Sequence, residues 1–337
     1  METVSPELLR GNVITTRIRL ARNLKDYPFY ISDQQKAKEI VKKVNRALVK
    51  CDTFNLYYVS NLDKLSLEAM KDKHLISQNL IDNPLGGAVL INLNEDLSIM
   101  INEEDVIREQ CFMKGLCLSE AYRRLDKIDD ELSKYLDIAY DDRFGYLTAC
   151  PTNMGTGLRA SVMMFLPALS MTGKIGELVE EVSRLGLTVR GAFGEGSQAE
   201  GYMYQISNEV TLGVSENEII RSVEETVLQI CKAERELAEK LFLKKDLKAM
   251  DKAKKSFGVL TNAVLLSYSE FLEHIANVKI GAMMGFLPIK EIEELDDLMV
   301  MVRPAVLSLK YGKKLSATDR DLFRAEVVGQ KLLKIKE

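Results

Sequence analysis

The sequence of 337 residues predicts an α+β fold, in which a largely antiparallel sheet flanked by helices precedes an all-helical C-terminal region. Up to about residue 215, short apolar or alternating runs are interleaved with amphipathic ones, whereas the remainder reads as almost unbroken helix. Two successive strand runs, 88–93 and 97–102, are too close together for a helical crossover. We therefore expect antiparallel pairing to dominate the sheet.

The predicted elements follow in chain order. Strands are predicted at residues 13–20, 55–60, 88–93, 97–102, 144–149, 158–166, 187–193 and 202–207. Helices between them are predicted to begin at Ser32, Ser66, Ser119 and about Thr172. From Ser215, apolar residues recur at helical spacing and predict one long amphipathic helix. The lysine-rich stretch 244–255 is interpreted as a solvated face or a connection between domains.

Composition excludes several kinds of protein. Lys and Arg number 46 against 50 Asp and Glu, a net charge of −4, which argues against direct nucleic-acid binding. No apolar run approaches the roughly 20 residues of a membrane span, and no signal peptide is evident, so we expect a cytoplasmic protein. Two histidines, and five cysteines without a C-x-x-C pair, argue against a protein-held metal or a disulfide framework. The chemistry should depend on Arg, Glu and Cys.

The first candidate site lies on the first strand. Alternation places Ile14, Ile18 and Leu20 on one face, and Arg17 and Arg19 together on the other. Two such guanidinium groups repel each other unless an anion or carboxylates lie between them, and a polyphosphate suits their geometry. An ordinary solvent face with salt bridges would give the same pattern.

The second candidate is the acidic segment 101–109, INEEDVIRE, directly after an apolar strand. Its carboxylates could complement the N-terminal dipole of a helix. Alternatively, one carboxylate points into a cleft to hold a cationic substrate while Arg108 turns towards a phosphate. The residues of this segment alone leave both interpretations open.

Two glycine-containing segments complete the set. The segment from Cys150 to Pro167 formally fits a dinucleotide-binding fingerprint, but that motif must open a helix, and the residues here predict a strand. What remains is a loop with Cys150 at its entrance and Arg159 at its exit. A cysteine near cations can have a lowered pKa, although a packing role is also open. The segment 189–201 has four glycines, carries Arg190, Glu195 and Glu200, and is either a ligand-binding loop or a surface hairpin.

These segments, in this order, resemble the guanidino phosphotransferase family, which contains creatine and arginine kinases. The motifs are N-E-E-D-x-x-R, C-P-T-N-x-G-T-G-x-R-A-x-V and V-R-G-x-x-G-E, and the resemblance covers about residues 13–245. It implies ATP with Mg²⁺, whose phosphates are held by Arg17, Arg19, Arg108, Arg159 and Arg190. It also implies Glu104 and Glu195 as substrate carboxylates and Cys150 as the reactive cysteine. One position departs from the family, which commonly has His where this chain has Val106.

Within the family, the chain most resembles the bacterial protein-arginine kinases. Its first arginine strand begins near residue 13, which leaves no room for the N-terminal helical domain of the phosphagen kinases. An R-D-x-x-R-A element near the other end matches the one that binds phosphoarginine in the bacterial group, at Arg320, Asp321, Arg324 and Ala325. An anion there would be favoured by the N-terminal end of a helix. The resemblance implies a catalytic domain at 1–245 and a helical domain at 246–337 for phosphoarginine binding and dimerisation.

The implied function is ATP-dependent phosphorylation of arginine side chains, which marks proteins for Clp-type proteolysis in the stress response. The implied partners of the homodimer are proteins with exposed arginines, among them a CtsR-like repressor, together with a McsA-like activator and a ClpC-like unfoldase. Two alternatives stay open. One is a free-arginine phosphagen kinase, and the other is a non-catalytic adaptor with a degenerate site, for which Val106 is the only support.

Overall fold

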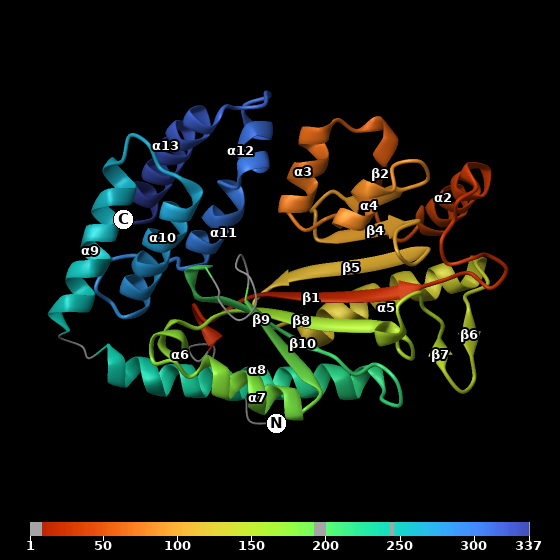
Figure 1. The fold of residues 1–337 in the computed structure, drawn as a ribbon, viewed down its shortest axis with the longest axis horizontal. Helices are drawn as coiled ribbons and strands as arrows, with labels where there is room; N and C mark the ends of the chain where they lie inside the picture. The colour runs from red at the N-terminus through yellow and green to blue at the C-terminus, as the bar shows by residue number, and fades with distance from the viewer. Residues whose placement is uncertain (1–8, 192–199, 243–245, 337) are drawn as a thin grey trace.

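The computed structural model describes residues 9–191, 200–242 and 246–336. Within them, one eight-stranded sheet has the order β2-β3-β4-β5-β1-β8-β10-β9, and every neighbouring pair is antiparallel (Figure 1). Its strands are β1 (Val13–Arg22), β2 (Phe54–Tyr58), β3 (Ala88–Asn92), β4 (Leu97–Ile101), β5 (Ile107–Lys114), β8 (Leu158–Phe165), β9 (Leu187–Gly191) and β10 (Met203–Asn208). The predicted α+β fold with a largely antiparallel sheet is confirmed.

One strand prediction needs correction, and one of the two interpretations of the segment 101–109 is excluded. The run 144–149 contributes only the two residues of β7 (Gly145–Tyr146), which pairs with β6 (Tyr140–Asp141) in a small separate hairpin. The segment 101–109 does not begin a helix. It turns tightly, with Asn102 in the left-handed region at φ 59° and its amide bonded to the Val106 carbonyl, and then enters β5 between β4 and β1. The polar residues of β5 concealed this central strand.

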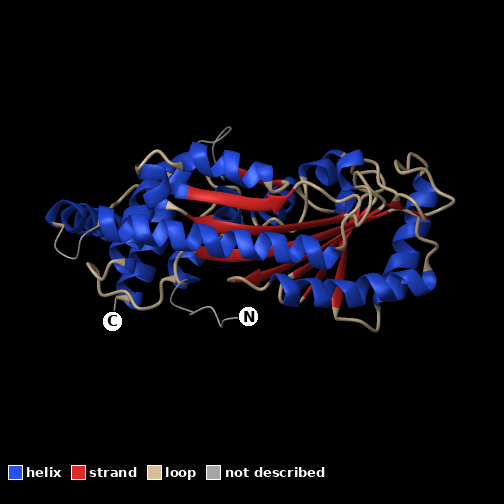
Figure 2. Ribbon diagram, turned by 90° about the horizontal axis from the view of Figure 1, so that it is seen from below, coloured by secondary structure: helices blue, strands red, loops and turns tan. Residues whose placement is uncertain are grey.

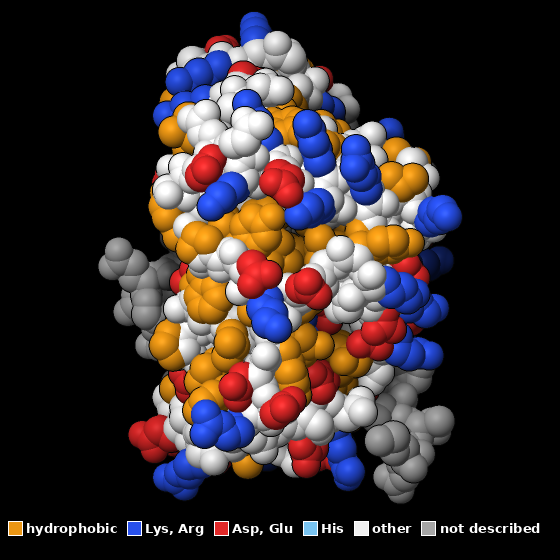
Figure 3. Space-filling model, turned by 90° about the vertical axis from the view of Figure 1, so that its right-hand side faces the viewer, with side chains coloured by type: hydrophobic (Ala, Val, Ile, Leu, Met, Phe, Trp, Pro, Cys, Tyr) orange, Lys and Arg blue, Asp and Glu red, His pale blue; other side chains and the backbone are white. Residues whose placement is uncertain are grey.

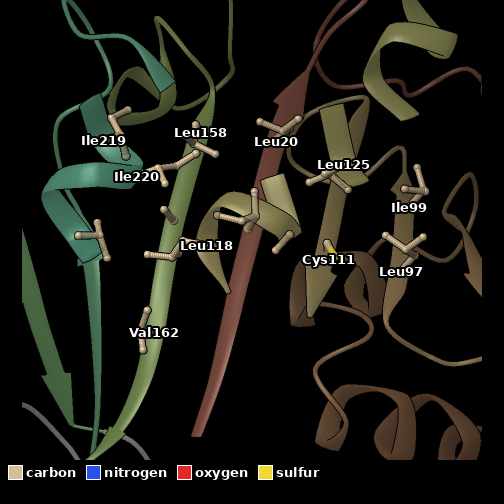
Figure 4. Packing of buried hydrophobic residues seen from close by; sticks show 14 of the residues in the cluster. Leu20, Leu97, Ile99, Cys111, Leu118, Leu125, Leu158, Val162, Ile219 and Ile220 are labelled. Carbon is tan, nitrogen blue, oxygen red and sulfur yellow. The ribbon is translucent and has the colours of Figure 1, made fainter. Parts of the chain in front are cut away.

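One face of the sheet is covered by α2 (Gln34–Leu48), α5 (Leu118–Tyr135), α7 (Ile175–Arg184) and α8 (Glu216–Leu241), and Figure 2 shows the longest of them. The main hydrophobic core lies between these helices and the strands. It includes Ile18 and Leu20, and Figure 4 shows Leu20 among its residues. The prediction that Ile14 shares this face is wrong, because a bulge after Val13 turns it towards the C-terminal helices.

The opposite face is covered at its two ends and open between them. At one end α3 (Lys64–Asp72) and α4 (Gln78–Asp82) pack on Val89 and Met100. At the other end, Phe165 packs against the C-terminal helices. These helices are α9 (Leu247–Asn262), α10 (Tyr268–Met283), α11 (Glu293–Met301), α12 (Pro304–Lys310) and α13 (Ala317–Ile335). The middle of the face, where Arg17 and Arg19 project, remains accessible.

The C-terminal helices also contact the far side of this opening. Arg303, at the N-terminal end of α12, donates to the Asp72 carbonyl, and the Ala305 amide donates to the Asp72 carboxylate (3.2 Å). The predicted domain boundary at residue 245 lies outside the described residues. In the described part of the chain, every helix is too short or too polar to cross a membrane.

The predicted helix starts are displaced by one to three residues in most cases. Aspartates rather than the expected serines cap two of them, since Asp33 and Asp63 accept hydrogen bonds from the first amides of α2 and α3. Cys117 and Lys174 precede α5 and α7 (Ile175–Arg184), and the short helix α6 (Pro167–Met171) was not expected. The long helix from Ser215 is confirmed, and Ser215 forms a capping box with Glu218.

The surface at the end of the molecule that carries α2 and the β6–β7 hairpin mixes both signs of charge. Figure 3 shows Lys and Arg side chains interspersed with Asp, Glu and hydrophobic ones on that face. No broad basic stripe crosses it, in keeping with the net charge of −4.

One charged residue interrupts the buried stripe of α8. Glu234 is 1% exposed, and its carboxylate accepts hydrogen bonds from the amides of Ala168 (2.7 Å) and Leu169 (2.9 Å) at the start of α6. Burial raises the pKa of Glu234 to about 7, although the two amide bonds oppose the shift. The contact between α8 and α6 therefore depends on a carboxyl group whose charge the interior disfavours.

Glu234→Gln should remove a pH dependence of stability. Because the pKa in the folded protein is above the ordinary 4.5, the folded protein binds more protons than the unfolded chain between these values. The contribution of this carboxyl to the free energy of unfolding thus falls as pH rises from about 5 to about 7. In urea denaturation, the free energy of unfolding of the wild type minus that of the variant should decrease over that pH interval and then become constant. Glu239→Gln, an exposed position on the same helix, is the control; a constant difference for Glu234→Gln contradicts the prediction.

Candidate active site

Four predicted arginines project from three adjacent strands onto the open face of the sheet. Arg17 and Arg19 lie on the central strand β1, and the backbone register places Arg19 directly opposite Arg159 of β8. On the other side, Arg108 of β5 is opposite Ala21 of β1. The alternation predicted for the first strand therefore gathers these guanidinium groups in one place.

The cluster carries more positive charge than its surroundings balance. Burial, with repulsion from Arg159 and Arg108, lowers the pKa of Arg17 to about 10. Burial and the neighbouring Arg17 hold the pKa of Arg19 well below its usual value. The Nε atoms of Arg19 and Arg159 are both buried without a hydrogen-bond partner. A polyanion would supply both the missing acceptors and the missing negative charge.

Strand β10 orients two of these arginines with neutral groups that the sequence pattern did not reveal. Arg17 Nη2 donates to Gln205 Oε1 (3.3 Å), and Arg159 Nη2 donates to Ser207 Oγ (3.0 Å). Both partners lie in the predicted strand 202–207. Their spacing of two residues, which places both side chains on one face, was the signal that could have revealed them. Because these acceptors are uncharged, they hold the side chains without neutralising them.

The carboxylates lie on the turn before β5 and are bridged by Arg108. Its Nη1 donates to Glu103 Oε1 (2.9 Å) and its Nη2 to Glu104 Oε2 (3.0 Å). Glu103 is buried and also accepts from Ser77 Oγ and from the Glu104 amide. The Glu104 side chain is 38% exposed. Glu103 thus supports the turn, and Glu104 is the carboxylate presented to solvent.

A cavity of about 170 Å³ brings five predicted residues together. It is lined by Arg19, Glu104, Arg108, Cys150 and Arg159, with Thr152, Asn153 and Gly157 from the loop before β8. An adjoining cavity of about 230 Å³ shares Arg19 and Arg108 and adds Arg17, Gln110 and His74. His74 therefore lies at the edge of the site. One hollow thus presents a carboxylate and a thiol beside three guanidinium groups.

The loop before β8 is shaped by close backbone packing. Cys150 precedes a turn at Pro151–Asn153, and its Sγ lies 3.0 Å from Thr152 Oγ1. Gly155 has φ +110°, and a Cβ there would lie 2.2 Å from the Thr211 carbonyl oxygen. The chain then enters β8 rather than a helix, which confirms the rejection of a dinucleotide fingerprint.

Arg190 lies at the edge of the site. Arg190 is an exposed residue of β9, opposite Gln205 of β10, and its charge contributes to a lowered pKa of Arg159, after burial. The predicted carboxylate Glu195 lies outside the described residues, and nothing is placed there. Among the described residues, no group of three or more His, Cys, Asp or Glu could hold a metal ion.

The predicted phosphoarginine element occupies the first turns of α13, where its two arginines differ. Arg324 is 1% exposed: its Nε donates to the Val302 carbonyl (3.1 Å), and its Nη1 donates to the Leu266 carbonyl and to Asp321 (both 2.7 Å). Arg320 is partly exposed, with a long contact to a carbonyl (3.4 Å). Asp321 and the buried Ala325 flank them. Arg324 therefore links α13 to the segments of Val302 and Leu266, whereas Arg320 is more exposed.

Two family descriptions match the chain. Residues 36–237 match the ATP:guanido phosphotransferase C-terminal catalytic domain, and residues 246–337 match the protein-arginine kinase McsB C-terminal domain. A protein-arginine kinase of Caldanaerobacter subterraneus is 42% identical over 96% of this chain and 97% of its own. One from Clostridium kluyveri is 44% identical over 96% of this chain and 95% of its own.

Solved structures agree with these matches. A duplicated taurocyamine kinase of Schistosoma mansoni superposes with a TM-score of 0.64 and 26% identity. The match covers 76% of this chain and 38% of that longer protein. Lombricine kinase superposes with a TM-score of 0.59 and 28% identity, over 67% of both chains. The helix-flanked antiparallel sheet is thus the fold of guanidino kinases.

Arg19→Met should stabilise the ligand-free protein and weaken the binding of polyphosphate. The substitution removes a charge that Arg17 repels and an Nε without a partner, while it keeps an apolar stem. We expect the free energy of unfolding to rise by about 1 kcal/mol, as at other functionally strained sites. Inorganic tripolyphosphate should bind at least about tenfold more weakly by calorimetry. Arg123→Met, on the exposed side of α5, is the control; a clear loss of stability in Arg19→Met contradicts the prediction.

Proposed function

We propose that this chain, which belongs to the ATP:guanido phosphotransferase family, is an ATP-dependent protein-arginine kinase. It transfers the γ-phosphoryl group of ATP to the guanidinium of arginine side chains in proteins. The observation that carries the proposal is the cavity in which Glu104 adjoins Arg19, Arg108 and Arg159. A cationic acceptor and an anionic donor can meet there.

The arginines of the open face hold the triphosphate. The buried, unpartnered Nε atoms of Arg19 and Arg159 fit an oxyanion, and Arg17, Arg108 and Arg190 surround them. Their positive charge neutralises the phosphoryl group as it is transferred. Mg²⁺, carried by the nucleotide, would neutralise further charge on the phosphates. Positioning and electrostatics supply most of the catalysis.

The carboxylates activate the acceptor. A guanidinium has a pKa above about 12, so its nitrogen attacks only when it is held and partly relieved of its proton. Glu104 and Glu195 hold the target arginine and align one nitrogen with the γ-phosphorus. The nitrogen–phosphorus bond forms as the bond to the ADP oxygen breaks, and the nitrogen's proton passes to one of these two carboxylates. Cys150 assists in orienting the guanidinium.

Val106 does not count against catalysis. Its side chain is fully buried in the main core on the other face of the sheet, and its amide donates to Asn23 Oδ1 (2.8 Å). Valine at this position therefore leaves the arginines and Glu104 in place. The only sequence feature that favoured a non-catalytic adaptor loses its force.

The cellular role extends this proposal. A catalytic domain at 1–245 would modify proteins, and a helical domain at 246–337 would bind phosphoarginine and form the homodimer. Modified proteins, such as a CtsR-like repressor, would pass to a ClpC-like unfoldase for proteolysis in the cytoplasm. A McsA-like protein would act as activator. The match of the C-terminal region to the McsB domain supports this placement.

One assay tests the activity. The purified protein is incubated with Mg-ATP and casein, and acid-labile phosphate on arginine is detected by mass spectrometry under neutral conditions. Phosphoarginine on casein is the expected result, and free arginine as the only acceptor would instead make the chain a phosphagen kinase. No transfer to either acceptor would overturn the proposal.

Glu104→Ala and Glu195→Ala should each abolish phosphoarginine formation. In Glu104→Ala, Arg108 keeps its bond to Glu103, so the turn and the affinity for ATP should be retained. Initial rates of phosphoryl transfer and calorimetric ATP binding separate the two effects. Glu95→Ala removes an exposed carboxylate paired with Lys73 outside the site and is the control. Activity that survives in both variants would refute the assignment.

Arg320→Ala and Arg324→Ala should separate binding from folding. Loss of Arg324 leaves the carbonyls of Val302 and Leu266 without their donor and should lower the free energy of unfolding by about 3 kcal/mol. Loss of Arg320 should change stability by less than about 0.5 kcal/mol. Arg320→Ala should nevertheless lose affinity for a phosphoarginine peptide in calorimetry. Unchanged binding by a folded Arg320→Ala variant would remove this element from the binding site.

A further inference from the structure

A buried carboxylate outside the cavity joins its two walls. Asp105 directly follows Glu104 and is fully buried. Its Oδ1 accepts two hydrogen bonds of 2.7 Å, one from Asn23 Nδ2 and one from the Ala149 amide. Ala149 is the residue before Cys150. One oxygen of the residue after Glu104 therefore binds the residue before Cys150, and both Glu104 and Cys150 line the cavity.

Asn23 completes the link from the end of β1. Besides Asp105, its Nδ2 donates to the Leu147 carbonyl (3.0 Å), and its Oδ1 accepts from the Val106 amide (2.8 Å). Asn23 is fully buried, so water does not compete for these bonds. Its Nδ2 therefore binds both the Glu104 turn and the segment before Cys150, and its Oδ1 binds the turn a second time.

We propose that Asn23 and Asp105 form a clamp that sets the separation between Glu104 and Cys150. Both are positioning residues, which touch neither nucleotide nor acceptor. The inference rests on the proposed function, because it assigns to the clamp the alignment of the acceptor guanidinium. The clamp predicts that transfer, rather than nucleotide binding, depends on the pair, since the arginines of β1 and β8 are held separately by Gln205 and Ser207.

The chemistry of the pair explains why alignment depends on it. Bonds to a carboxylate are shorter and stronger than bonds between neutral groups. In the interior, both loops are fixed to the same oxygen, so a change at one is transmitted to the other. Misalignment of reacting groups by about 1 Å can cost about 100-fold in rate.

A charge exchange tests the clamp. Asn23→Asp places two carboxyl groups against each other, and Asp105→Asn weakens the bond to Ala149. Each should lower kcat for casein phosphorylation by about 10- to 100-fold and leave ATP affinity within about twofold. The double variant Asn23→Asp with Asp105→Asn again places a donor opposite an acceptor between the two side chains, so kcat should recover over that of Asn23→Asp. Because the amide nitrogen introduced at position 105 donates to position 23, the atom that accepted from the Ala149 amide is lost, and kcat should not exceed that of Asp105→Asn. Hydrogen exchange at the Ala149 amide should be faster than in the wild type whenever Asp105→Asn is present.

Asn92 provides a matched control. It is a buried asparagine whose Nδ2 donates to Asp96 (2.7 Å) and whose Oδ1 accepts two amides, but it lies outside the cavity. Asn92→Asp should lower stability without changing kcat. The clamp is overturned if the single variants keep their kcat, or if Asp105→Asn leaves hydrogen exchange at the Ala149 amide as slow as in the wild type. If the wild type transfers no phosphoryl group, the proposed function fails, and exchange at Ala149 alone decides whether the clamp holds the loop.

Discussion

Repulsion among the arginines of the open sheet face is the constraint on which the rest of the structure depends. Arg17 and Arg19 share the central strand, and Arg159 faces Arg19 from the next. In water such groups would separate, but a strand cannot rotate one residue without moving its whole face. The cluster persists because the other face of β1 is fixed in the core by Ile18 and Leu20. Hydrophobic burial on the core face of β1 offsets the electrostatic cost of the arginines on its open face.

The layout of the helices follows from the same constraint. A helix laid over the middle of the arginine face would bury unpaired charge, so α3 and α4 cover one end and the C-terminal helices the other. Contacts from Arg303 and Ala305 to Asp72 then join these two covers beside the opening. The site is thus a gap in the packing between the two covers, and the described residues that line its two cavities all precede residue 160.

Periodicity in the sequence predicted the elements whose side chains alternate or repeat regularly. It did not reveal polar residues that are buried because they bind partners distant in the chain. The paired arginines of β1 followed from alternation alone, and the long helix from Ser215 followed from helical spacing. Sequence reasoning missed strand β5 because Arg108, Glu109 and Gln110 interrupt its apolar pattern. In the structure, an ion pair to Glu103 holds Arg108, and hydrogen bonds to backbone carbonyls hold Gln110, whereas Glu109 is fully buried without a hydrogen-bond partner among the described residues. The burial of Arg324 was equally hidden, since its carbonyl partners are distant in the chain. The roles assigned to Glu104, Cys150 and Glu195 came from resemblance and remain predictions.

The fork of Arg108 across Glu103 and Glu104 bears on which side chains can act as acceptors. In the structure, Arg108 already makes with Glu104 the kind of contact that an acceptor arginine would make. An incoming guanidinium would then exchange with a chemically identical group, and Arg108 would become available to the phosphate. Lysine carries a compact ammonium without the planar fork of a guanidinium. A lysine that displaced Arg108 from Glu104 could therefore not make the same bond in the same geometry. Discrimination between the two basic amino acids would then be a property of the resting enzyme.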